Sequence, residues 1–143
     1  MIDLNEATLF ALRLIAGPDG KQTCPASVRT VAILGSTTFE VQSGGLLGWL
    51  MNCAGVQEVL DTKAALERIG DTQAALALDE ILGHLPRREL PADSDTLVSL
   101  GDQNQARWLE VERMLPSPRL HALLQAYVDA NAADFGSPDM ERT

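Results

Sequence analysis

The chain has 143 residues, of which 20 are acidic and 11 are basic, and its formal charge is −9. This length fits a single domain, and a hydrophobic content of 45 % is too high for a disordered protein. The negative charge argues against binding to nucleic acid or to an anionic membrane through the whole surface, because both would be repelled. It permits a basic partner.

The sequence shows no targeting or membrane-spanning segment. Its first residues lack the basic region of a secretory signal, and no apolar stretch approaches the ~20 residues that cross a bilayer. Cys24 and Cys53 are the two cysteines, and without a secretory context we expect buried or half-buried thiols rather than a disulfide. We therefore expect a soluble protein of the cytoplasm.

The N-terminal part of the chain has mostly helical periodicity. Apolar residues predict a first helix over residues 4–16, which Gly17 ends, and a polar loop at residues 19–23. A second helix is expected over residues 25–41, because proline suits a first helical turn. Residues 31–34 have a strand as an alternative, since they are a short apolar run.

Glycine residues mark the ends of the segments that follow. Gly44 and Gly45 are expected to form a tight turn between helices, and Gly55 closes a short apolar segment. A helix is predicted over residues 56–69, where apolar side chains keep helical spacing, and Gly70 is its stop.

Capping chemistry predicts how this helix joins the next one. Asp71 is expected to cap a helix that continues to Leu85, so that one glycine separates two helices arranged as a hairpin or a corner. Residues 86–91 begin and end with proline and are expected to be irregular.

The C-terminal part predicts two further helices. Ser94 or Asp95 is expected to cap a helix over residues 96–115. Ser117 is expected to cap the last helix, which Pro118 begins and which has the cleanest apolar stripe of the chain.

One domain accommodates all of these elements. The tail from Ala132 is expected to be frayed, and no internal repeat or second composition regime is visible. We therefore expect a compact all-α domain over residues 1–143, a bundle of about seven helices with short connections.

Residues for catalysis or metal binding are scarce. His84 and His121 are the two histidines, and both are expected to be partly buried or solvated helix residues rather than catalytic ones. Cysteines and histidines lack CxxC, HxxxH or HExxH spacing, and no glycine-rich phosphate loop is present. Trp49 and Trp108 are expected in the core, with an interface role as the alternative. We expect no metal, no cofactor and no enzymatic activity.

The negative charge is concentrated in the middle of the chain. Residues 58–112 contain twelve acidic and five basic residues, so seven of the nine net charges lie there. Carboxylates spread over an exposed face can imitate the phosphates of a duplex and so occupy a basic groove, although such faces also serve solubility alone. The candidate partner-binding carboxylates are Glu58, Asp61, Asp79, Glu80, Glu89, Asp93 and Asp95.

Residues 40–55 contain a glycine-rich motif. The run V-Q-S-G-G-L-L-G-W-L-M-N-C-A-G resembles V-x-N-G-G-F-x-Q-[YF]-F-x-N-S-x-G, the signature of a family of small bacterial helical proteins. The matching residues include Gly44, Gly45, the aromatic Trp49, Asn52 and Gly55, and the departures include Ser43, Leu46, Gly48 and Cys53.

Two further blocks extend the resemblance to residues 38–93. Residues 65–75, which include Gly70, resemble A-L-x-x-I-G-A-x-x-x-A, and residues 85–91 lie where the family has F-P-G-G-x-x-P. The family includes a DNA-mimic protein that binds a transcription regulator. The resemblance thus implies an all-α fold, a homodimer as one assembly, structural roles for the signature residues, and DNA mimicry as one function.

These observations lead to one hypothesis with two rivals. We expect a non-enzymatic bacterial protein whose acidic middle third binds a basic protein, such as a DNA-binding regulator, and which contacts neither nucleic acid nor a membrane. An immunity or antitoxin protein that caps a toxin is the first alternative. The second is a helical domain with another role.

Overall fold

The computed structural model describes residues 1–17 and 24–136. Within them the chain is helical and has no β-strand, which confirms the all-α expectation. The described elements are α1 (Leu4–Ala16), α3 (Ala26–Asn52), α4 (Val56–Ile69), α5 (Thr72–His84), η1 (Pro86–Arg88), α6 (Ser94–Gln103), α7 (Gln105–Glu112), α8 (Pro118–Ala130) and η2 (Ala132–Phe135). The polar loop expected at residues 19–23 lies outside the described residues, as do residues 137–143 of the expected tail.

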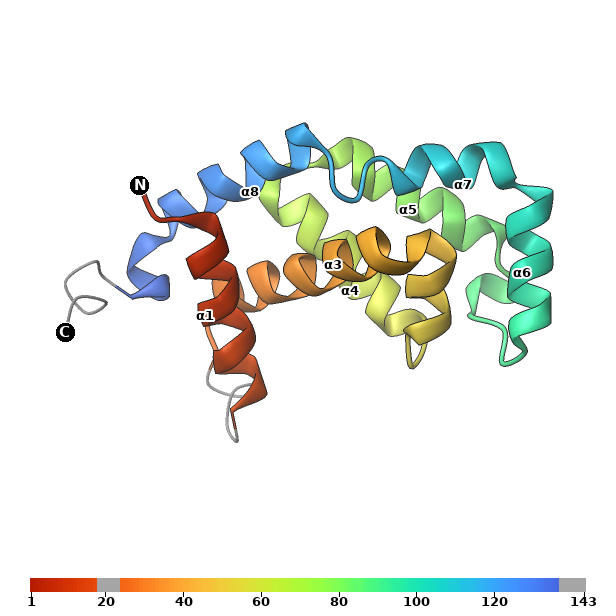
Figure 1. Cartoon of the computed structure of the whole chain (residues 1–143), viewed down its shortest axis with the longest axis horizontal. Coiled ribbons are helices and arrows are strands. Elements are labelled where there is room, and N and C mark those ends of the chain that lie inside the picture. Colours follow the sequence, from red (N-terminus) through yellow and green to blue (C-terminus); the bar gives the residue numbers. More distant parts are fainter. Residues whose placement is uncertain (18–23, 137–143) are drawn as a thin grey trace.

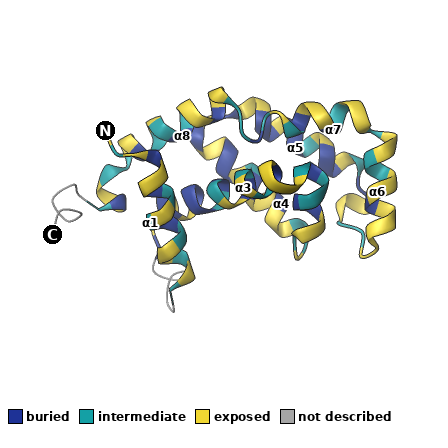
Figure 2. Ribbon diagram, in the orientation of Figure 1, coloured by how far each residue is buried: buried dark blue, intermediate teal, exposed yellow. Residues whose placement is uncertain are grey.

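Helix α3 is the axis of the molecule. It runs through the middle of the fold, with α1 across one end and α6 at the other (Figure 1). It contacts α1, α4, α6, α7 and α8. Buried residues recur along it from Val28 to Leu50, and the inward faces of the surrounding helices are likewise buried (Figure 2). Most of the other helices are therefore positioned by packing against α3, while α5 packs on α4 and α7.

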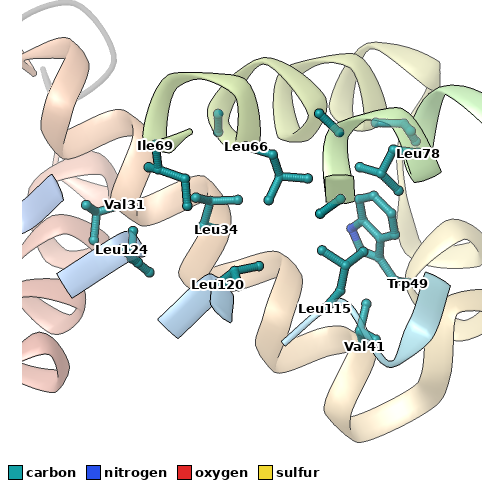
Figure 3. Packing of buried hydrophobic residues seen from close by; sticks show 14 of the residues in the cluster. Val31, Leu34, Val41, Trp49, Leu66, Ile69, Leu78, Leu115, Leu120 and Leu124 are labelled. Atoms are coloured by element: carbon teal, nitrogen blue, oxygen red, sulfur yellow. The ribbon is translucent and has the colours of Figure 1, made fainter. Parts of the chain in front are cut away.

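The core is mainly aliphatic, as the scarcity of aromatic residues predicts. Leu34 of α3 lies against Leu66 of α4, and Leu120 of α8 approaches from the other side (Figure 3). Leu34 and Leu66 are both 0 % exposed. Truncating such a leucine to alanine removes about 2–5 kcal/mol from the free energy of unfolding.

The predicted joint between α4 and α5 is confirmed. Gly70 ends α4 with a φ of 89°, in the left-handed region where glycine is favoured. The side chain of Asp71 then accepts a hydrogen bond from the backbone N–H of Ala74 at 3.2 Å, which caps α5. Both features depend only on local sequence.

The strand alternative for residues 31–34 is wrong. These residues lie inside α3, where Val31 and Leu34 are fully buried and three residues apart, on one face of the helix. A short apolar run has the same composition in a buried helix as in a buried strand.

The single helix expected over residues 96–115 is also wrong, because the chain turns at Asn104 and forms α6 and α7. The Asn104 side chain donates to the carbonyl of Leu100 at 2.9 Å and its backbone leaves the helical region. The turn places the ring of Trp108 against Gly101, where an added Cβ would lie 3.4 Å from the ring. The cap of α6 is Asp93, one residue before the expected range.

The tail expected to fray from Ala132 is ordered up to residue 136. Phe135 is 1 % exposed, and its ring packs edge-on against Phe10 with centroids 6.3 Å apart. The hydroxyl of Ser27 donates to Asp134 at 2.6 Å. Tertiary contacts with α1 and α3 thus hold a segment whose local composition predicts fraying.

The two ends of the described chain also meet. The backbone N–H of Ile2 donates to Asp129 of α8 at 3.1 Å, and the side chain of Gln125 donates to the Ile2 carbonyl at 2.8 Å. These bonds fasten the start of α1 to α8.

The turn η1 has an unusual backbone. Arg87 and Arg88 have φ values of 55° and 57°, in the left-handed region that costs a residue with a side chain roughly 1–2 kcal/mol. They occupy the two positions where the family pattern F-P-G-G-x-x-P has glycine. Glycine would adopt this backbone without that cost, whereas Arg87 and Arg88 carry it.

We expect Arg87→Gly to be about 1 kcal/mol more stable than Arg87→Ala in urea unfolding. Both variants remove the same exposed side chain, but only glycine relieves the left-handed backbone. Equal stability of the two variants would show that this turn relaxes without cost.

Candidate functional site

The glycine pair of the signature lies at a kink in α3. Gly45 has φ 74° and ψ 176°, which divides the helix into two arms. The N–H of Leu46, at the start of the second arm, donates to the carboxylate of Glu112 from α7 at 2.7 Å. A Cβ on Gly45 would lie 2.6 Å from that carboxylate oxygen. A negative charge at a helix N-terminus is favourable, so Glu112 caps the second arm from a distant part of the chain.

The other signature residues surround this second arm. Trp49 is 2 % exposed and belongs to the core, whereas Asn52 is exposed at the last position of the arm. Gly44 has open space around it, and Gly55 precedes α4 in an extended conformation open to any residue. Gly45 and Gly70 are thus the signature positions whose backbone favours glycine.

A pocket of about 340 Å³ opens beside this arm, between α1, α3 and α4. Leu12 and Ile15 of α1, together with Ile33 and Trp49 of α3, supply apolar lining. Thr37 and Thr62 also line it, and their hydroxyls form a buried hydrogen-bonded pair at 3.1 Å. Polar and charged residues make up most of the remaining lining, so this pocket is more polar than a typical small-molecule site.

Three carboxylates line the same pocket: Glu40, Glu58 and Asp61. Glu58 accepts from the N–H of Ala54 at 3.2 Å, and Asp61 accepts from the side chain of Gln57 at 2.9 Å. Glu40 is half-buried and forms no hydrogen bond or ion pair within residues 1–17 and 24–136. Sequence reasoning missed Glu40, because it precedes the acid-rich segment and only the packing of α3 on α4 brings it to Glu58.

The pKa of the Cys53 thiol is affected by burial and by the negative charge of this region. Burial raises the pKa of its thiol to about 12, and a hydrogen bond to Glu58 and the charges of Glu58 and Glu40 add to the increase. Cys24 is buried elsewhere, and burial raises its pKa against the opposing charge of Arg29. Both cysteines are free thiols, as the sequence predicts.

Two of the seven candidate carboxylates are paired with cations. Asp79 lies 2.8 Å from Arg88 and 3.6 Å from Lys63, and its pKa is lowered mainly by the hydrogen bond from Arg88. Glu80 pairs with Arg107, which also pairs with a second carboxylate at 2.6 Å. These pairs are exposed and stabilise the fold little, but they reduce the charge that Asp79 and Glu80 offer to a partner.

Of the other three candidates, Glu89 and Asp93 lie on the connection from α5 to α6 and Asp95 lies in the first turn of α6. This connection is on the same lower edge of Figure 1 as the turn between α3 and α4. Asp93 caps α6, and its pKa is lowered mainly by the hydrogen bond from the Thr96 hydroxyl. Glu89 and Asp95 are exposed and have no ion pair in the part of the chain that the structure describes. The seven candidates therefore divide into three sets. Glu58 and Asp61 line the pocket, Asp79 and Glu80 are paired with cations, and Glu89, Asp93 and Asp95 are exposed near the start of α6.

The histidines lie in separate surroundings. His84 Nδ1 accepts a hydrogen bond from the indole of Trp108 at 3.0 Å, and the two rings stack. His121 is exposed and lines a different hollow beside Phe39. Within the described ranges neither histidine bonds to a carboxylate or a nucleophile, and no group of three or more potential ligands could hold a metal. None of the described helices is both long and apolar enough to span a membrane.

Comparison with known proteins identifies the family. The family described as DMP19-like protein matches residues 22–135, so the chain belongs to the DMP19-like family. Neither a curated protein nor a solved structure matches the chain. The match extends well beyond residues 38–93 and runs through α3 to η2, whereas α1, one wall of the pocket, precedes it.

Gly45→Ala and Gly44→Ala form a matched pair that tests the kink. We expect Gly45→Ala to lose about 2 kcal/mol in the free energy of unfolding, because its left-handed backbone and the approach to Glu112 both oppose a side chain. Gly44→Ala should be neutral or slightly stabilising, since its surroundings are open. Chemical unfolding measures both, and equal losses would contradict the proposed geometry.

The alkylation rate of Cys53 tests the carboxylate cluster, and a Cys24→Ala background isolates that thiol. We expect slow reaction with iodoacetamide at pH 8, because a thiol with a pKa of about 12 is almost wholly protonated there. Glu40→Gln with Glu58→Gln should raise the rate several-fold by lowering that pKa, whereas Glu89→Gln should leave it unchanged. A wild-type rate that levels off below pH 9 would contradict the geometry.

Proposed function

We propose that this member of the DMP19-like family is a non-enzymatic protein that binds a basic protein partner through uncompensated carboxylates, and that the partner is a DNA-binding regulator. The observation that carries the proposal is that the basic residues of the acid-rich region, residues 58–112, pair with some of its carboxylates and leave others unpaired. Lys63, Arg88 and Arg107 are engaged in ion pairs, while Glu58, Asp61, Glu89 and Asp95 have no cation partner among the described residues.

Unpaired carboxylates favour a basic partner for two reasons. They attract a basic surface over a Debye length of about 8 Å at physiological ionic strength, which speeds encounter. They are also free to pair with arginine and lysine without first breaking an internal ion pair, as Asp79 and Glu80 would have to do. A groove that binds DNA phosphates has this complementary chemistry.

A binding role also agrees with the rest of the molecule. An enzyme needs a base within hydrogen-bond reach of a nucleophile or of its substrate, and the histidines supply no such pairing in the described chain. The sequence resemblance adds a family in which one member is a DNA mimic. The homodimer and the location in the cytoplasm remain predictions.

The test compares two triple variants of equal net charge. Glu89→Gln, Asp93→Asn and Asp95→Asn together remove exposed charges, and asparagine keeps the cap of α6. Glu67→Gln, Asp79→Asn and Glu80→Gln remove the same number of charges from ion pairs. We expect the first triple to weaken capture of the partner from native cell lysate at least tenfold and to flatten its salt dependence. The second triple should have a clearly smaller effect.

Competition with duplex DNA identifies the class of partner. If the captured protein is a DNA-binding regulator, added duplex DNA should release it from the immobilised chain, because both compete for one basic surface. Capture that survives the first triple and high salt would overturn the proposal. Capture of a toxin enzyme that added DNA does not release would favour an immunity protein instead.

A further inference from the structure

We infer that the hydrogen bond between His84 and Trp108 is a pH-sensitive tie between α5 and the corner formed by α6 and α7, and that protonation of His84 in mildly acidic solution breaks it. The proposed function uses neither residue. The inference concerns the chain alone and needs no partner, so each of the two proposals can fail without the other.

The side chain of Trp108 fills the corner between α6 and α7. Trp108 is 5 % exposed, and a Cβ added to Gly101 of α6 would lie 3.4 Å from its ring. Helix α7 also carries Glu112, which caps the second arm of α3, and α6 begins at the exposed carboxylates Asp93 and Asp95. A contact that fixes Trp108 therefore helps to fix the two helices that position these carboxylates.

The tie itself is a hydrogen bond at the end of α5. The indole N–H of Trp108 donates to Nδ1 of His84 at 3.0 Å and forms no other hydrogen bond within the described ranges. His84 is half-buried and is the last residue of α5. Because Nδ1 accepts, this nitrogen must carry no proton, so the bond exists only with the neutral imidazole.

Protonation would place two donors against each other. The Nδ1–H of an imidazolium and the indole N–H would then face one another, and neither can accept, so the buried indole N–H would lose its partner. A cation is attracted by an aromatic ring within ~6 Å of the ring centroid, but these two centroids are 6.5 Å apart and the ring planes differ by 12°. The charge of His84 therefore offers Trp108 little in exchange for the lost bond.

No other charged group competes for His84 in the described chain. The charged groups that pair with α5 or lie within one turn of His84, Trp108 or Gly101 are Lys63, Glu80, Arg87, Arg88, Asp102, Arg107, Glu110 and Glu112. None of them forms a hydrogen bond or an ion pair with His84, and Lys63, Arg88 and Arg107 are held in ion pairs with carboxylates. The bond to Trp108 is therefore the specific contact that depends on the protonation of His84.

The expected change is local. An exposed ion pair between Glu80 and Arg107 also joins α5 to α7, and carboxylates ordinarily stay ionised down to about pH 4. Helix α7 therefore remains on α5 in mildly acidic solution, while the ring of Trp108 and its contact with Gly101 lose their fixed position.

The experiment is a two-dimensional NMR titration of the full chain from pH 8 to pH 5. We expect the indole N–H signal of Trp108 to move in a one-proton step between about pH 5 and 7, with the same midpoint as the ring C–H signals of His84. The amide signals of α6 and α7 should move with it. The indole signal of Trp49, which bonds to neither histidine, is the internal control and should not follow this step.

A matched pair of histidine variants identifies the group that titrates. His84→Asn keeps an acceptor in place of Nδ1 and takes up no proton, so its Trp108 signal should stay constant from pH 8 to pH 5. His121→Asn should leave the step unchanged, because His121 is exposed and lines a different pocket.

Stability should follow the same step. The fold favours the neutral ring, so the stability that the bond contributes is present above the step and is lost as the pH falls through it. In urea unfolding, lowering the pH from 8 to 5 should raise the unfolding equilibrium constant of the wild type about tenfold relative to that of His84→Asn.

Three results would overturn the inference: a Trp108 signal that stays constant down to pH 5, a step that persists in His84→Asn, or a step that disappears in His121→Asn. The titration of the unaltered chain remains decisive if His84→Asn folds poorly, because a Trp108 signal that does not share the midpoint of the His84 ring contradicts the tie.

Discussion

The hydrogen bond from Leu46 to Glu112 is the contact on which the centre of the molecule depends. At this point α3 breaks at Gly45, and the N–H groups that begin its second arm have no partner within the helix. A carboxylate from α7 supplies that partner, so the direction of the second arm is fixed by a residue 66 positions away in the chain. The position of Trp49 in the core, and with it one wall of the pocket, follows from that direction.

Where structure follows from short-range chemistry, the sequence predicted it well. The bounds of α1 and α4, the glycine stop at Gly70, and the caps at Asp71 and Ser117 are all as expected, because each depends on a few neighbouring residues. The break at Asn104 was not predictable, since it depends on how Trp108 packs against Gly101 and His84. The ordered segment around Phe135 depends in the same way on Phe10 of α1.

The candidate site was predictable only as a region. Counting charges located the acid-rich segment, but it could not show that cations from other helices pair with Asp79 and Glu80. It also left out Glu40, whose proximity to Glu58 comes from the packing of α3 against α4. A charge total describes a stretch of chain, whereas a partner meets the charges that remain after the fold has paired the others.

The fastening of Ile2 to α8 has a consequence for how the protein is made. Its bond to Asp129 spans 127 positions, so it closes a loop that includes nearly the whole described chain. Because a ribosome releases the N-terminus first, α1 emerges long before the helix that fastens it. The N-terminus can therefore be fastened to α8 only after Asp129 has been synthesised, whereas α1 can pack against α3 earlier, and contacts of such long range slow folding.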